Sequence, residues 1–219
     1  MLDVFNIAKP QNCDVQVFYG GGDSLYNLNY RTWSKPRGVS HVYMLLIGGG
    51  ASGNTSTTGG GSGAVTVWYG AAMHVPDVLY VQPGGVAGSS LVFTKTGSTA
   101  YHSLANANGA SVNVGGAAES GNLAFYKTGF FSSTAGQNGS TSNVTPSATT
   151  FLSGGSDLGS DRVVGNYGYN APSSNANGYF LLNPLPVSLG GSGGGRGGIG
   201  SGGGRSASGG PGMILIASW

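Results

Sequence analysis

Short apolar runs separated by glycine and small polar residues set the pattern of this chain. No window shows an apolar stripe at helical spacing, and Gly, Ser, Thr and Asn interrupt almost every ten residues. The runs have the length and the β-branched and aromatic content of strands. The pattern predicts an all-β protein, a single sandwich or jelly-roll-like domain with long glycine-rich loops. The predicted strands are residues 15–19, 41–47, 64–69, 78–81, 90–94, 110–114, 123–126, 179–182 and 213–216.

Two runs, residues 42–47 and 213–216, are apolar at consecutive positions. A strand buried on both faces has this character, so we expect the two runs to be neighbouring strands in the core. Residues 65–69 and 111–114 instead alternate apolar and polar side chains, which is the period of half-buried strands. These two strands are expected nearer an edge.

Three connections are long and poor in apolar residues: residues 48–63, 131–150 and 190–212. Long loops of this kind in a compact domain are either disordered or functional. For residues 190–212, composition favours disorder, whereas the core-type strand that follows anchors the segment. Glycine also allows backbones to approach closely, as in polyglycine or polyproline II packing. Both interpretations stay open at this point.

The charge and composition of the chain favour a self-associating protein and argue against binding to nucleic acid. The 219 residues fit one domain, with 39% hydrophobic residues but only 7% charged, far below the roughly 25% of ordinary soluble proteins. The nine Lys and Arg are dispersed and the net charge is +2, so no basic patch for nucleic acid is expected. A chain with so little charge repulsion is expected to form a homo-oligomer.

The lone cysteine and the two ends of the chain give further expectations. Cys13 has no partner for an intrachain disulfide, and we expect it to be a small buried apolar residue. No apolar run approaches the roughly 18 residues that span a bilayer, and the start of the sequence, residues 1–5, lacks the basic region followed by a long apolar region that marks a signal peptide. Neither membrane insertion nor export by a signal peptide is expected.

The sequence offers no convincing catalytic, cofactor or metal motif. Ser192 lies in a G-x-S-x-G match inside a glycine tract, without the strand and helix that such a nucleophile requires. Asp157 and Asp161 are the only acidic residues close together, and we interpret them as a surface turn. The three histidines lack the spacing of zinc ligands. We therefore predict no enzyme, no catalytic or metal site and no cofactor.

Three tyrosines are the best candidates for contact with a partner. Tyr167, Tyr169 and Tyr179 lie among Asn, Gly, Ser and Pro, which is the composition of adaptable recognition loops. Exposed rings can stack on sugars or on a partner protein. The alternative is that these rings pack over a glycine-rich surface of the same protein.

Three stretches of the chain, near its start, in its middle and at its C-terminal end, contain motifs in a recognisable order. Trp33 precedes a turn at Pro36 and Gly38, followed by the strand at residues 42–47 and a glycine block. Residues 83–91 form a central glycine turn, and residues 209–219 close the chain with a glycine tract, one apolar strand and a terminal tryptophan. In this order the chain resembles the glycine-rich domain of phage tail-fibre and virion surface proteins, over residues 33–219.

The resemblance implies a structural role and no activity. It implies a virion surface protein of a phage, exposed as a capsid spike or decoration or as a fibre tip, in contact with other virion proteins and assembled as a homo-oligomer, expected to be a trimer. Residues 1–32 would be the N-terminal attachment segment and residues 33–219 the glycine-rich β domain. The second hypothesis is a carbohydrate-binding adhesin that contacts a host surface glycan, and the third is a depolymerase with a dispersed active site.

Overall fold

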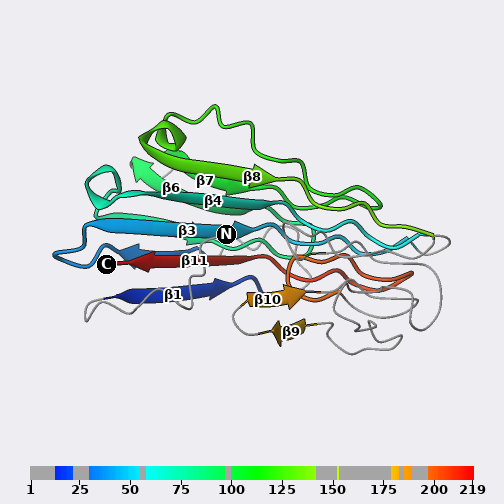
Figure 1. Ribbon diagram of the computed structural model, residues 1–219. Coiled ribbons are helices and arrows are strands. Elements are labelled where there is room, and N and C mark those ends of the chain that lie inside the picture. Colours follow the sequence, from blue (N-terminus) through cyan, green and yellow to red (C-terminus); the bar gives the residue numbers. More distant parts are fainter. Residues whose placement is uncertain are drawn as a thin grey trace.

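Two antiparallel β-sheets packed face to face form the computed structural model of the protein (Figure 1). The structure describes residues 13–21, 30–54, 58–96, 100–141, 152, 179–182, 185–188 and 197–219. Within these residues the helical elements are two short 3₁₀ turns, η1 (Ala72–His74) and η2 (Ala124–Thr128). The prediction of an all-β sandwich is therefore confirmed.

The first sheet has five strands and contains both of the strongly apolar runs. Its order is β1 (Asp14–Tyr19), β11 (Met213–Ser218), β3 (His41–Ile47), β4 (Val65–Ala71) and β8 (Gly129–Thr134). β11 lies antiparallel to β3, with Met213 opposite Ile47 and Ser218 opposite Val42. All six residues of β11 are buried. The expectation that these two runs are neighbouring core strands is confirmed.

The second sheet has four strands and closes the core. Its order is β2 (Arg31–Ser34), β5 (Val78–Gln82), β6 (Ser90–Thr96) and β7 (Ala100–Ala107). Trp33, Leu79 and Val92 of this sheet pack in one cluster with Met44, Trp68 and other residues of the first. β9 (Tyr179–Leu182) and β10 (Leu185–Ser188) form a separate antiparallel pair.

Two predicted strands are wrong. Residues 111–114 form a tight turn closed by a bridge between Ser111 and Val114, because Asn113 takes a left-handed φ of 66°, which Asn tolerates better than most residues. Val112 and Val114 are more than half exposed there. The run at 123–126 falls instead in η2, which buries Phe125 against Trp68 with ring centroids 4.4 Å apart.

Four strands were not predicted, namely β2, β7, β8 and β10. The sequence of β7 is AYHSLANA and that of β8 is GFFSST. Because small and polar residues interrupt the apolar positions of both strands, neither sequence shows a clear strand pattern. Residues 131–134, which we had placed in a long connection, belong to β8. Residues 14–19 of the predicted attachment segment are an edge strand of the first sheet, while the division at residue 32 stays a prediction.

The glycine-rich connections leave the same end of the sheets and lie against one another (Figure 1). We call residues 48–54, 58–64, 83–89, 108–116, 135–140 and 197–212 the glycine bundle. In the segment 48–54, the backbone N–H groups of three consecutive residues donate to three different neighbouring segments. The N–H group of the fourth residue donates to the same segment as the first. The acceptors are Ala64 O for Gly48, Gly88 O for Gly49, Gly210 O for Gly50 and Gly61 O for Ala51, at 2.8–2.9 Å.

A repeat of three residues distinguishes this packing from a β-sheet, where the repeat is two. The same repeat appears in the returning segment, where Gly60 and Gly63 donate to Gly203 and Gly200 at 2.8 and 2.7 Å. Three residues per turn with hydrogen bonds only to other segments is the geometry of polyproline II. The bundle is thus an array of extended segments held together by backbone hydrogen bonds in several directions.

Glycine is required in this array because neighbouring backbone occupies the place of its side chain. A Cβ added to Gly50 would lie 2.0 Å from Ser201 O, and one added to Gly63 would lie 2.1 Å from Gly48 O. Neither distance is compatible with a real contact. Disorder was one of the two interpretations of residues 190–212. Residues 197–212 are packed in this way against neighbouring segments, and residues 190–196 lie outside the described residues.

Candidate functional site

Two turns and two other stretches of the described chain meet at the end of the glycine bundle away from the sheets. We call this the turn end: residues 54 and 58, 111–114, 138–141 and 204–207. Asn54 N–H donates to Thr58 O at 2.8 Å, and Ser206 N–H donates to Asn54 O at 3.1 Å. Asn113 connects the turn at residues 111–114 to two neighbouring segments. Its backbone carbonyl accepts from Gly139 N–H at 3.2 Å, and its side-chain amide oxygen accepts from the Thr58 hydroxyl. Segments more than a hundred residues apart are thus held in one surface.

The backbone of the turn end is held in unusual conformations. Asn113 has φ of 66° and Ser206 has φ of 59°, both in the left-handed region that non-glycine residues rarely adopt. Such residues persist only where the surrounding structure fixes them, and they concentrate at binding sites and switches. The neighbouring glycine segments provide that support through the hydrogen bonds described above.

The exposed side chains at the turn end offer polar and apolar contacts to a ligand. Arg205 and Ser206 are exposed, as are Val112 and Val114. Amide, hydroxyl and guanidinium groups beside small apolar side chains provide hydrogen-bond donors, acceptors and a hydrophobic contact. A surface of this kind can recognise a polar ligand such as a sugar or a peptide.

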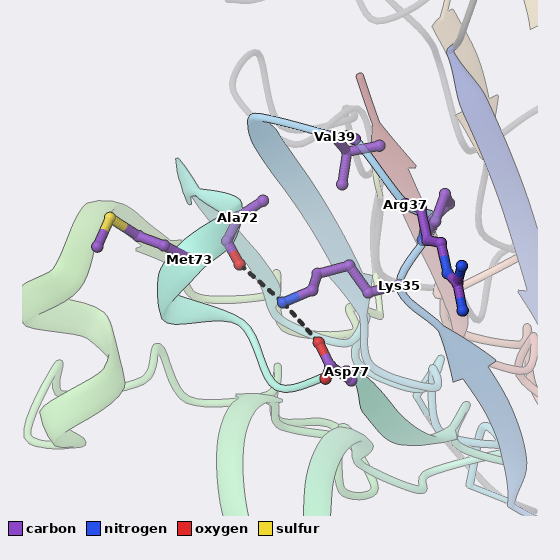
Figure 2. A pocket seen from close by; sticks show the side chains of 8 residues that line it. Lys35, Arg37, Val39, Ala72, Met73 and Asp77 are labelled. Carbon is purple, nitrogen blue, oxygen red and sulfur yellow. Dashed lines mark hydrogen bonds and ion pairs between the residues drawn. The ribbon is translucent and has the colours of Figure 1, made fainter.

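A shallow hollow lies at the opposite end, between the loop after β2 and η1 (Figure 2). It has a volume of about 520 Å³ and is lined by residues 35–39 with Ala72, Met73 and Asp77. Lys35 Nζ lies 2.9 Å from Asp77 Oδ1 and donates to Ala72 O and Val75 O at 3.2 and 2.7 Å. All three ammonium protons therefore have acceptors, so Lys35 joins two loops and is not poised for catalysis.

Within the described part of the chain, no three His, Cys, Asp or Glu side chains gather where they could hold a metal ion. A search of those same residues finds no helix with the length and apolarity needed to cross a bilayer. Cys13 is half-buried, so the expectation of a fully buried thiol is wrong, because the residue lies just before an edge strand.

Two buried tyrosines have strongly shifted acidity. Burial raises the pKa of Tyr43, on the outer face of β3, to about 12. Burial also raises the pKa of Tyr126 to about 12, and the nearby Glu119 carboxylate acts in the same direction. The hydrogen bond from Asn106 N–H to the Tyr126 hydroxyl, at 2.9 Å, acts in the opposite direction and lowers this pKa. Both phenols stay neutral in the folded protein under conditions where a free tyrosine ionises.

The protein is therefore expected to lose stability in alkali. Above pH 10 the unfolded chain releases the Tyr43 and Tyr126 protons, whereas the folded protein holds them until about pH 12. Between those values the free energy of unfolding falls by about 1.4 kcal/mol per pH unit for each phenol. Urea denaturation across pH 8–12 measures this slope. The double variant Tyr43→Phe/Tyr126→Phe should have a shallower slope, and an unchanged slope would contradict the assignment.

The residues singled out from the sequence mostly fall elsewhere. Tyr167 and Tyr169 lie outside the described residues, as do Ser192, Asp157 and Asp161. Tyr179 begins β9, but its side chain lies outside what the structure describes. The recognition role of the three tyrosines stays a prediction.

The turn end was not found from the sequence. Asn54, Asn113 and Arg205 are far apart in the chain, and each is a polar residue in or near a glycine-rich stretch, which is common in this sequence. The one usable signal was that these residues interrupt the glycine blocks near their midpoints, where a returning segment has to turn.

The architecture defines an all-β protein with two antiparallel sheets. Comparison with known proteins finds no family model and no curated relative that matches the chain.

Proposed function

We propose that this chain is a non-enzymatic structural protein on the surface of a phage particle, as a capsid spike or decoration or a fibre tip, and that it self-associates. The particle is suggested by the resemblance in the order of motifs over residues 33–219. The structural observation that supports the role is the glycine bundle, which holds the turn end away from the two sheets (Figure 1).

The bundle supports a display role because it is built to hold one shape. Each segment is bonded to several others, and neighbouring carbonyls fill the places of the missing side chains. Opening one segment therefore breaks bonds to several neighbours, which favours slow unfolding. Slow unfolding suits a protein that persists outside a cell.

A carbohydrate-binding adhesin is the second candidate, and the turn end is the observation that favours it. Exposed Arg205 and Ser206 share the turn end with Asn54 and Asn113, and hydrogen bonds between segments hold the backbone of this surface. A preorganised surface loses little entropy on binding. This function is compatible with the first, since a particle protein can also carry the receptor contact.

Particle labelling tests the proposal directly. An antibody raised against the recombinant chain is applied to purified particles of the virus whose genome encodes it, and binding is located by electron microscopy. We expect labelling of intact particles at a fixed position, and mass spectrometry of the same particles should contain the chain. Its absence from washed, infectious particles would refute the proposal, and a glycan array probed with the same protein distinguishes the adhesin.

A further inference from the structure

The edge strand β1 differs from the other edges of the two main sheets. Among the described residues it pairs only with β11. Phe18 points into the core, whereas Val15, Val17 and Tyr19 lie on the outer face and are 46%, 37% and 49% exposed. An apolar edge strand with free N–H and C=O groups is a template for pairing with another strand.

The other three edges of the two main sheets carry features that oppose such pairing. β2 has only four residues and begins with Arg31. In β7, Asn106 N–H donates to the Tyr126 hydroxyl at 2.9 Å, and the ladder to β6 is interrupted at Val92. β8 ends in Ser-Ser-Thr, and the Ser133 hydroxyl accepts from Glu119 N–H at 2.8 Å. β1 contains no Lys, Arg, Pro or Gly, and its register with β11 is continuous.

We infer that β1 is the self-association surface, pairing antiparallel with β1 of a second copy to form one continuous ten-stranded sheet. This inference rests on the proposed self-association and names the surface responsible. A twofold axis at Val17 places Val15 opposite the second copy's Tyr19 and Gln16 opposite its Phe18. All three outer apolar side chains then stay on one face, as the alternation of a strand requires.

The charges of β1 favour a second copy as the partner. Asp14 is the only charged residue of the strand, and its carboxylate accepts from the Gln16 amide at 2.8 Å. In the pairing about Val17 the two Asp14 residues lie at opposite ends, each facing Gly20, so like charges do not meet. An axis at Gln16 would place Asp14 opposite Phe18, which is a core residue, and is therefore disfavoured.

Cysteine crosslinking tests both the surface and the register. In a Cys13→Ser background, Val17→Cys places one thiol from each copy beside the axis, within reach of a disulfide. We expect oxidation to give a covalent dimer on a non-reducing gel. The matched control is Val78→Cys in the same background, at a similarly exposed position on β5 (46%), which should stay monomeric on that gel.

Light scattering gives a second, independent readout. The unmodified chain should have the mass of a dimer, or of an even multiple, and Val17→Lys should weaken self-association at least tenfold while Val78→Lys does not. Tyr19→Lys serves if Val17→Lys is misfolded by circular dichroism. A monomer, a trimer, or an oligomer without the 17–17 disulfide would overturn the inference. Labelling of particles would be unaffected by any of these results, so the virion role is tested separately.

Discussion

Replacing Gly50 with alanine is expected to lower the free energy of unfolding by more than about 3 kcal/mol. The new Cβ would lie 2.0 Å from Ser201 O and 2.3 Å from Ser201 C, and both atoms are backbone. Relief requires two segments of the glycine bundle to separate, which breaks the bond from Gly50 N–H to Gly210 O as well. For a chain of this size the melting temperature should fall by about 10 °C.

Gly38→Ala is the matched control for that prediction. Gly38 has φ of 80°, so alanine is strained there, but nothing lies within 4 Å of the added methyl group. The strain alone is expected to cost about 1 kcal/mol. Urea denaturation of both variants measures the difference. Equal losses for Gly38→Ala and Gly50→Ala would show that the close packing of the bundle is not rigid.

Deletion of residues 213–219 is expected to abolish soluble folding. β11 lies between β1 and β3, so its removal leaves β1 without a partner and β3 paired with β4 alone. Ile214 and Ile216 are fully buried, and loss of each such side chain costs about 2–5 kcal/mol. Those two losses alone come to about 4–10 kcal/mol, against the roughly 5–15 kcal/mol that stabilises a typical domain. The measurement is the soluble fraction after expression, with circular dichroism of whatever remains soluble.

A shorter deletion separates the strand from the residue that follows it. Removing Trp219 alone loses its stacking on His41 and Tyr69, at 6.0 and 5.8 Å between ring centroids, and its backbone hydrogen bonds with Ser40 and His41. The core of β11 is left in place, so this variant should fold with a lowered melting temperature. A soluble, cooperatively melting protein lacking all of residues 213–219 would contradict the central position of β11.

The core could be predicted from the sequence because burial on both faces leaves a direct trace in it. Residues 42–47 and 213–216 are uninterrupted apolar runs, and only a central position in a sheet uses them fully. The error at residues 111–114 has the opposite origin. Two valines two positions apart suggested a strand, but the left-handed Asn113 turned the chain after only a few residues.

The turn end could not be predicted, because the usual periods do not apply to the glycine bundle. Strand and helix patterns are read from side chains, whereas the partners of Gly48, Gly49 and Gly50 are set by a threefold backbone repeat without side chains. Nothing in the residue types says that Asn54 lies beside Ser206. The position of β1 at the edge of its sheet could not be predicted either, because its sequence fits an edge strand and an inner strand equally well.

The glycine bundle also affects how stability changes with temperature. Its buried surface consists mainly of peptide groups, while the two sheets bury apolar side chains. Unfolding apolar surface raises the heat capacity, and unfolding polar surface lowers it. The bundle therefore offsets part of the heat-capacity increase contributed by the core. We therefore expect the stability curve of this chain to be flatter than that of a sandwich of equal length with ordinary loops, so that its free energy of unfolding varies less between cold and warm surroundings.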